Sequence, residues 1–310
     1  MQITGKRYLD YTSFIRSTFG ERVQKISINA GFTCPNRDGT KGYGGCTYCN
    51  NDSFHPDYCQ PDVPVDSQIQ KGIHFFNQKY GIQKYLAYFQ SYTNTYADID
   101  SLKKLYSKAL EHPEIIGLVI GTRPDCISDA ILDYLEKLAE NYFITLEIGI
   151  ESTLDKTLQT VNRAHTYQDT IAAFERAKNR GIHLGGHLIL GLPGENKDQL
   201  LNHARNVSKL PLDSLKLHQL QIVKNSVMAV QYRSNPEGFN LFSVEEYVDL
   251  ITEFIGLLRP DIIIGRFAGE SAKELLVAPH WNLKNFEIVA KIDKALEENN
   301  SWQGKYYVSR

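Results

Sequence analysis

The stretch VQKISINAGFTCPNRDGTKGYGGCTYC, residues 23–49, joins a short strand to a loop that carries three cysteines. Residues 23–28 are strand-like, and glycines at positions 31, 39, 42, 44 and 45 exclude a regular element from the loop that follows. Cys34, Cys46 and Cys49 have the spacing C-x11-C-x2-C. Glycines also let a loop wrap a bulky group without Cβ clashes. The stretch therefore predicts a strand that delivers three thiols to one place.

Strand-like and helix-like segments alternate over the rest of the chain. We expect strands at residues 85–89, 115–120, 143–150, 183–190 and 215–220, and a short one at 262–265. We expect helices at residues 8–19, 66–80 with Asp66 as the N-cap, 98–110, 128–140, 154–161, 167–180, 197–209, 243–258 and 285–298. Six strand–helix units in a row predict an α/β fold whose parallel sheet curls into a partial (β/α)6 barrel. The cysteine loop then lies at the carboxyl ends of the strands, where such barrels carry their chemistry.

The length of 310 residues is compatible with two small domains or with one α/β barrel. We expect a helical preface at residues 1–22, a barrel core at 23–225, and a C-terminal helical extension at 226–310 that closes the barrel. A net charge of −2 provides no overall basic field. The chain starts with polar residues, and no apolar run reaches the roughly 18–20 residues of a membrane span. The sequence therefore predicts a soluble, cytoplasmic protein.

Three of the five cysteines lie in the loop, which favours metal binding by reduced thiols over a disulfide framework. Three thiolates can hold three irons of a four-iron cluster and leave one iron open. S-adenosylmethionine (SAM) suits that open iron, because its amino and carboxylate groups can chelate it. A Cys3His zinc site with His55 as fourth ligand is the alternative that the spacing leaves open. Cys59 and Cys126 are expected to be ordinary thiols.

Further motifs resemble those of one branch of the radical SAM superfamily, which includes Elongator's catalytic subunit and the oxygen-independent coproporphyrinogen oxidase. They are TRPD at residues 122–125, EIGIES at 147–152, VNRAHT at 161–166 and GLPGE at 191–195. Glu151 stands where that branch has Gln, and Ala164 where it has Gly. The cysteine spacing and the segments KLHQL at 216–220 and RFAGE at 266–270 look most like the YhcC/YtqA-type (MnmL-like) family within the branch.

The resemblance implies a [4Fe–4S] cluster on Cys34, Cys46 and Cys49, with SAM beside it. The residues that it assigns to SAM are Tyr48 and Gly191 at the adenine, Gln90 and Thr93 near the methionine amino group, Glu151 at the sulfonium and Arg163 at the carboxylate, with Asp125, Ser152 and Lys216 completing the set. Arg is well suited to planar carboxylate recognition. The alternative for Arg163 is a solvated charge at a helix end. The alternative for Glu195 is a cap of the helix that follows it.

The resemblance also implies tRNA modification, in which a 5′-deoxyadenosyl radical leads from carboxymethylaminomethyluridine to aminomethyluridine at the wobble position. Lys216, His218 and Arg266 are the candidate catalytic residues, because each could hold the substrate carboxylate. The implied partners are tRNA, an electron donor such as flavodoxin or ferredoxin, and a downstream methyltransferase, with no membrane. Candidate RNA contacts are Lys284, Lys291, Lys294, Trp302, Lys305, Tyr306, Tyr307 and Arg310. An ordinary amphipathic helix with a frayed tail is the alternative for that stretch.

Two other functions stay open at this point. One is a radical SAM enzyme that acts on a small molecule, which would need an enclosed pocket. The other is a zinc-stabilised binding module without redox chemistry, which would be colourless and carry zinc.

Overall fold

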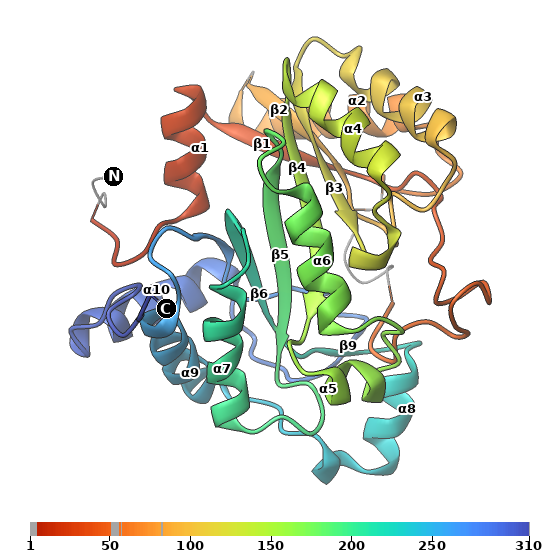
Figure 1. Cartoon of the computed structure of the whole chain (residues 1–310). Coiled ribbons are helices and arrows are strands. Elements are labelled where there is room, and N and C mark those ends of the chain that lie inside the picture. Colours follow the sequence, from red (N-terminus) through yellow and green to blue (C-terminus); the bar gives the residue numbers. More distant parts are fainter. Residues whose placement is uncertain (1–4, 51–55, 57, 82, 310) are drawn as a thin grey trace.

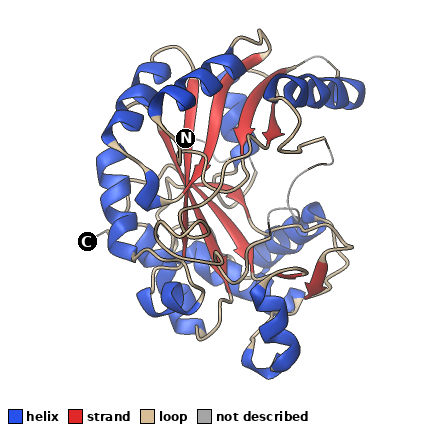
Figure 2. Cartoon of the chain, turned by 90° about the vertical axis from the view of Figure 1, so that its right-hand side faces the viewer, coloured by secondary structure: helices blue, strands red, loops and turns tan. Residues whose placement is uncertain are grey.

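The computed structural model describes residues 5–50, 56, 58–81 and 83–309 (Figure 1). Their largest sheet has seven strands in the order β1-β2-β3-β4-β5-β6-β8, and every neighbouring pair is parallel. The strands are β1 (Val23–Ile28), β2 (Lys84–Phe89), β3 (Ile115–Thr122), β4 (Phe143–Glu151), β5 (His183–Leu190), β6 (Ser214–Gln219) and β8 (Ile263–Arg266). Figure 2 shows the sheet curled around an open side with helices on its outer face. The predicted α/β half-barrel is confirmed.

The sheet is one strand wider than the six strands of the predicted barrel. The short strand expected at 262–265 is β8, which joins the edge beside β6 in parallel register. A second, two-stranded sheet pairs β7 (Ile222–Val223) with β9 (Leu276–Ala278) and was not predicted. Both of its strands are too short to show a period in the sequence.

The helices follow the strands as the alternation predicts. They are α1 (Tyr11–Phe19), α2 (Val65–Tyr80), α3 (Ile99–Leu110), α4 (Asp129–Ala139), α5 (Asp155–Thr160), α6 (Tyr167–Ala177), α7 (Lys197–Val207), α8 (Val227–Ser234), α9 (Val244–Leu257) and α10 (Asn285–Glu298). Side-chain caps fix several starts, among them Ser128 and Thr166. The prediction of Asp66 as an N-cap is wrong: Pro64 holds that position, and Asp66 lies in the first turn beside His112. Helix α8 was not predicted. No helix in the described part of the chain is long and apolar enough to cross a membrane.

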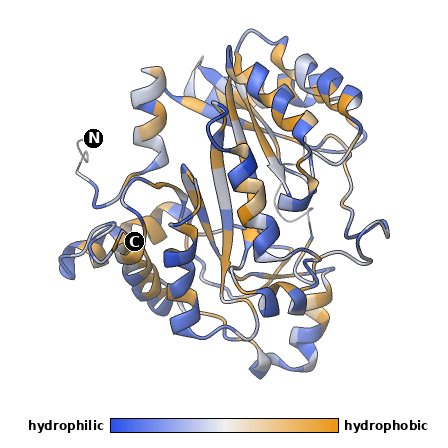
Figure 3. Ribbon diagram, viewed as in Figure 1, coloured by the Kyte–Doolittle hydropathy of each residue, from blue (hydrophilic) through white to orange (hydrophobic). Residues whose placement is uncertain are grey.

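The two faces of the sheet differ in polarity because side chains alternate along each strand. In β4, Ile144, Leu146, Ile148 and Ile150 are buried in the main hydrophobic cluster beneath the helices. The intervening residues of β4, such as Glu147, line the concave face instead. Figure 3 shows the covering helices with mixed hydrophilic and hydrophobic residues, as amphipathic helices have. The core therefore lies between sheet and helices, and the concave face is left for a polar site.

Helix α1 closes the barrel at the amino ends of its strands. The carbonyl of Leu9 accepts a hydrogen bond from the Ile264 amide at 2.7 Å, next to a parallel bridge between Asp10 and Ile264. On the other side, the Phe14 ring stacks on His183 at the start of β5 with a centroid distance of 5.2 Å. The predicted helical preface is thus packed against strands from both halves of the sheet.

Candidate active site

A cavity of about 1090 Å³ lies along the concave face of the sheet. Its lining includes residues of all seven strands of the main sheet, together with parts of the cysteine loop and α1. Most of the residues predicted for the site line it: Cys34, Cys46, Tyr48, Cys49, Gln90, Thr93, Glu151, Arg163, Lys216, His218 and Arg266. The fold therefore brings together side chains that are up to 232 positions apart in the sequence, counted from Cys34 to Arg266.

The cysteine loop is fastened to the segment VNRAHT that follows α5. The Asn162 side chain donates hydrogen bonds to the carbonyls of Gly45 at 2.8 Å and Tyr43 at 3.1 Å. In return, the Asn36 side chain donates to the Asn162 carbonyl at 2.5 Å. Asn162 can make these contacts because it adopts a left-handed backbone conformation with φ of 53°. Two motifs that are separate in the sequence thus form one rigid rim.

Positive charge lies against the cysteine thiols. The Arg123 Nη1 atom is 3.9 Å from Cys34 Sγ, and Arg163 Nη1 is 3.6 Å from Cys46 Sγ. Burial, and then the neighbouring Cys46, raises the pKa of Cys49 to about 12, while the charges of Arg37 and Arg163 oppose that shift. Cationic surroundings favour thiolates over thiols, so these guanidinium groups suit an anionic metal–sulfur centre.

The other two thiols, Cys59 and Cys126, do not form a metal site with the cysteine loop in the described part of the chain. No three His, Cys, Asp or Glu side chains within the described ranges are grouped so as to hold one metal ion. His55, the predicted zinc ligand, lies outside the described residues. Cys59 is buried away from the cavity lining, and Cys126 lies beside Asp125 with its sulfur 3.8 Å from Asp125 Oδ1. The assignment of Cys34, Cys46 and Cys49 as cluster ligands stays a prediction.

Arg163 and Glu151 form a buried pair beside the cysteine loop. Arg163 Nη2 lies 3.2 Å from Glu151 Oε1 and donates to the Gly149 carbonyl at 3.0 Å. A Cβ atom at Gly149 would lie 2.5 Å from Arg163 Nη2 and from Glu151 Oε1, so a larger residue there would displace the side-chain ends that form the pair. Arg163 is only 7% exposed, which shows that the alternative of a solvated helix-end charge is wrong. Burial raises the pKa of Glu151, with Arg163 opposing that effect.

Near the cysteine loop, two residues that line the cavity have a buried atom with no hydrogen-bond partner among the described residues. The two atoms are Arg163 Nε and the Tyr48 hydroxyl. A buried donor without a partner is costly, so a bound polar group would relieve both positions. Gln90 and Thr93 follow β2 on the same cavity wall.

Three residues predicted to bind SAM do not line the cavity. Asp125 is held by Arg123, with oxygen–nitrogen distances of 2.9 and 3.0 Å, and by Lys41 at 2.9 Å. Although burial raises the pKa of Asp125, these two cations lower it to about 2. Ser152 is fully buried and donates to Glu195. A Cβ atom at Gly191 would lie 2.9 Å from the Phe242 ring, so the missing side chain leaves room for that ring. Asp125 and Ser152 are thus bound by protein side chains, and the roles of these two residues and of Gly191 in SAM binding stay predictions.

Glu195 does not cap α7, so that alternative is also wrong. Asn196 is the N-cap and forms a capping box with Gln199. The Glu195 carboxylate is instead buried, where it accepts from Ser152 Oγ at 2.5 Å and lies 3.2 Å from His203 Nε2.

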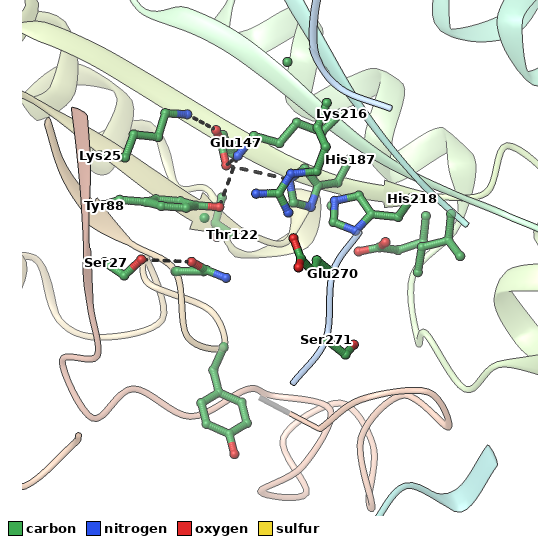
Figure 4. A pocket seen from close by; sticks show the side chains of 18 of the residues that line it. Lys25, Ser27, Tyr88, Thr122, Glu147, His187, Lys216, His218, Glu270 and Ser271 are labelled. Carbon is green, nitrogen blue, oxygen red and sulfur yellow. Dashed lines mark hydrogen bonds and ion pairs between the residues drawn. The ribbon is translucent and has the colours of Figure 1, made fainter. Parts of the chain in front are cut away.

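A polar cluster that sequence reasoning missed lies deeper in the cavity, around Glu147. One oxygen of Glu147 is 2.9 Å from Lys25 Nζ, and the other is 2.6 Å from Lys216 Nζ and 3.7 Å from His187 Nε2 (Figure 4). Burial and the nearby Lys25 lower the pKa of Lys216 to about 7, while Glu147 opposes the shift. The signal that could have found the cluster is the recurrence of polar residues two positions apart, in β6 as Ser214, Lys216 and His218, with Glu147 in β4 and His187 in β5 on the same face.

The Lys216 ammonium is therefore already bound by Glu147. This placement does not favour the predicted pairing of Lys216 with the SAM carboxylate. Arg266 is its register neighbour on β8, and His218 follows two residues later on β6, with its ring 5.0 Å from that of His187. The three predicted catalytic residues share one wall of the cavity.

The C-terminal basic and aromatic stretch does not line the cavity, and its predicted contact with RNA stays a prediction. The tail packs at the amino end of β8, where Gln303 Nε2 donates to the Ile262 carbonyl at 2.7 Å and the Tyr306 amide donates to the Gly256 carbonyl at 2.7 Å. Lys284 precedes α10, and Arg310 lies outside the described residues.

Comparisons with known proteins agree with this arrangement. The radical SAM superfamily model matches residues 29–207, and the Radical_SAM C-terminal domain model matches residues 212–298. The chain is 33% identical to the uncharacterized protein YtqA of Bacillus subtilis, over 98% of this chain and 94% of that protein. It is 36% identical to protein YhcC of Escherichia coli K12, over 91% of this chain and 89% of that protein.

More distant matches share part of their length with the chain. A tRNA uridine(34) acetyltransferase of Methanocaldococcus infernus is 24% identical over 50% of this chain and 30% of that protein. The solved structure of an archaeal Elp3 from the same organism superposes with a TM-score of 0.67 at 17% identity, over 91% of this chain and 64% of that chain. At that identity the likeness shows the fold alone.

Proposed function

Because the chain belongs to the radical SAM superfamily, we propose that it modifies the C5 side chain of the wobble uridine in tRNA. Family membership makes it an enzyme whose cofactors are a [4Fe–4S] cluster and SAM. A zinc-stabilised module without redox chemistry does not fit this membership. The substrate and the reaction below are the proposed part.

The residues at the mouth of the cavity fit these cofactors. Cys34, Cys46 and Cys49 would supply three thiolates, and the guanidinium groups of Arg123 and Arg163 balance the negative charge there. When bound and reduced, the cluster and SAM together supply a 5′-deoxyadenosyl radical that removes a hydrogen atom from the substrate.

The chain's own side chains then position SAM. The unpartnered Nε of Arg163 and its buried charge suit the SAM carboxylate. Tyr48 lies between two of the cysteines and would pack against the adenine, and Gln90 and Thr93 would hold the methionine amino group. Glu151 would face the sulfonium. Asp125 and Ser152 act through the residues they hold, since neither reaches the cavity.

An excess of positive charge along the cavity supports a polyanionic substrate, and this observation carries the proposal. Nine Lys and Arg residues of the described chain line the cavity, against three Glu residues: Arg16, Arg22, Lys25, Arg37, Arg123, Arg163, Lys216, Arg266 and Lys273, against Glu147, Glu151 and Glu270. The whole chain has 34 Lys and Arg against 36 Asp and Glu. A cation-rich cavity in a chain with no net positive charge suits nucleic acid. The relative named as a tRNA uridine(34) acetyltransferase supports the choice of tRNA.

The proposed reaction converts carboxymethylaminomethyluridine to aminomethyluridine. The carboxymethyl CH2 would lose a hydrogen atom, and the carbon radical would then lose one electron and one proton to give a C=N bond. The cluster, when bound and oxidised, would supply the electron acceptor, and solvent or a side chain would take the proton. The resulting C=N bond is hydrolysed by water to the primary amine and glyoxylate. Arg266 would hold the carboxylate during these steps, with Lys216 and His218 on the same wall of the cavity. Flavodoxin or ferredoxin would supply the electron for the radical, and a methyltransferase would act downstream.

The test is direct conversion of the tRNA nucleoside. Holoenzyme, SAM and a reductant are incubated with tRNA that carries deuterium on the carboxymethyl CH2, and nucleosides and 5′-deoxyadenosine are analysed by mass spectrometry. We expect aminomethyluridine, glyoxylate and deuterated 5′-deoxyadenosine. If product forms while the 5′-deoxyadenosine carries no deuterium, hydrogen abstraction at that carbon is wrong. If holoenzyme leaves the tRNA unchanged but cleaves SAM with a small molecule, the small-molecule alternative replaces this proposal.

A further inference from the structure

We propose that Arg266 and Glu270 form a subsite for an amino-acid-like zwitterion, in which Arg266 binds the carboxylate and Glu270 binds the ammonium. The inference rests on the proposed function, since the carboxymethylaminomethyl group carries a secondary ammonium one carbon from its carboxylate. It adds Glu270, to which nothing above assigns a role, as the residue that recognises the nitrogen.

The segment that carries both residues is held firmly beside β6. The Gly269 amide donates to Gln219 Oε1 at 2.8 Å, and Gln219 Nε2 donates to the Gly269 carbonyl at 3.0 Å. Ser271 Oγ donates to Gln221 Oε1 at 2.7 Å, and the buried Tyr247 hydroxyl donates to the Phe267 carbonyl at 2.5 Å. Residues 266–271 are thus a fixed wall of the cavity.

Gly269 allows this wall to approach His218 closely. A Cβ atom at position 269 would lie 2.6 Å from His218 Nδ1, so any other residue would push the segment away from the ring. His218 Nε2 is buried and has no hydrogen-bond partner among the residues that the structure describes. Figure 4 shows the Glu270 carboxylate turned toward the space in front of the His187 and His218 rings. His218, which has this unpartnered nitrogen, therefore lines the same cavity as the proposed subsite.

Arg266 and Glu270 are the charged residues of this wall whose side chains are not engaged by other described residues and can therefore bind a ligand. Glu147 is saturated, because it already binds Lys25 and Lys216. By contrast, neither Arg266 nor Glu270 makes an ion pair or a side-chain hydrogen bond with another described residue, although both line the cavity. The charge of Arg266 contributes to lowering the pKa of His187, His218 and Lys216, which shows that it acts on this interior space.

Binding of three nucleosides to the anaerobic holoenzyme with SAM tests the subsite. 5-Carboxymethylaminomethyluridine carries both charges, 5-carboxymethyluridine carries only the carboxylate, and 5-aminomethyluridine carries only the ammonium. Each is titrated by calorimetry against the wild type, Glu270→Gln and Arg266→Gln. Glu274→Gln and Arg233→Gln are matched controls, because these exposed residues do not line the cavity.

We expect Glu270→Gln to weaken the zwitterionic nucleoside about 10-fold and to leave 5-carboxymethyluridine unchanged or tighter. Arg266→Gln should weaken both carboxylate-bearing nucleosides and spare 5-aminomethyluridine. The controls should match the wild type. If both variants bind all three nucleosides as the wild type does, or lose all three equally, the subsite is overturned even where tRNA is converted.

N-Methylglycine separates this inference from the proposed function, since it has the same charged atoms without the uridine. If it binds with the same dependence on Glu270 and Arg266 while tRNA is never converted, the subsite stands and the tRNA substrate is wrong. If neither N-methylglycine nor the zwitterionic nucleoside binds the wild type, the subsite is wrong.

Discussion

At the scale of single residues, two arginines make the cysteine loop suitable for an anionic centre. Arg123 and Arg163 come from separate motifs, and each places a guanidinium nitrogen within 4 Å of a different thiol, at 3.9 Å from Cys34 and 3.6 Å from Cys46. Both side chains are buried, so their charge acts through little solvent. Because the two contacts are separate, loss of one cysteine should remove a ligand without collapsing the loop.

Replacing any one of Cys34, Cys46 and Cys49 by Ala should abolish the iron–sulfur cluster, because a site with two thiolates cannot hold it. Wild-type protein reconstituted without oxygen should bind about four irons and show the brown absorbance of the cluster. Iron assay and visible spectra measure the effect. Cys59→Ala and Cys126→Ala are the controls and should keep the full iron content. A Cys46→Ala protein that retains four irons would contradict the ligand assignment.

The residues that carry the site differ in how far the sequence revealed them. Motifs predicted Arg163, because it and its neighbours form the recognisable string VNRAHT. Glu147 is the first residue of the EIGIES motif, but neither this motif nor any other predicted its pairing with Lys25. The two residues pair because the strand register puts side chains of β1 and β4 on one concave face. A short sequence motif does not contain this information. The motif predicted that Gly191 contacts the adenine of SAM, but it could not predict that the Phe242 ring packs against this glycine.

At the scale of elements, the long strands and capped helices could be predicted and the short connections could not. Strand β4 has nine residues and strand β5 has eight, and both strands place apolar side chains on the face that the helices cover. Helix α8 and the β7–β9 pair lack such a signal, because strands of two and three residues have no measurable period. Strand β8 was predicted, but its place beside β6 follows from tertiary packing.

The junction between β4 and α7 shows how elements are locked around the site. Glu195 accepts from Ser152, directly after β4, and lies beside His203 on α7. Thr153 continues the network through a contact of 2.7 Å with His203 Nδ1. Because Ser152 follows Glu151, this buried network fixes the end of β4 where Glu151 meets Arg163.

Glu195→Ala should therefore lower both stability and SAM affinity while leaving the iron content unchanged. It removes the buried acceptor of the Ser152 hydroxyl, which costs about 1–3 kcal/mol, and also the carboxylate beside His203 Nε2. Glu195→Gln keeps an acceptor for Ser152 and should lose less. Denaturant unfolding and SAM titration measure the two effects. Glu253→Ala is the control, since its pair with Lys197 is exposed and contributes less than about 1 kcal/mol. Normal SAM affinity in a destabilised Glu195→Ala protein would limit this network to a structural role.

At the scale of the whole molecule, the distribution of charge matters more than its sum. Composition shows a net charge of −2, and from this the sequence could indicate only that any RNA contact is local. The fold gathers cations of α1, the cysteine loop, the strands and the segment after β8 along one cavity. The net charge of the whole chain hides this local excess of positive charge, which becomes visible only in the folded structure. The C-terminal cations, which the sequence suggested as the contact, do not line this cavity.

Binding of tRNA should therefore depend on the cations that line the cavity and not on those of the C-terminal stretch. The triple variant Arg16→Gln, Arg22→Gln and Lys273→Gln removes three exposed cavity-lining charges outside the catalytic and cofactor sites. Its matched control, Lys291→Gln, Lys294→Gln and Lys305→Gln, removes three charges that do not line the cavity. Affinity of labelled tRNA is measured by fluorescence anisotropy over a series of salt concentrations. Each lost phosphate contact lowers the slope of log affinity against log salt by about 0.7–0.9. We expect the cavity variant to lower the slope by about two and the control to keep the wild-type slope, because counterion release requires contact with phosphate. The reverse result, a reduced slope in the control alone, would place tRNA on the C-terminal stretch and remove the cavity's charge excess as support for an RNA substrate.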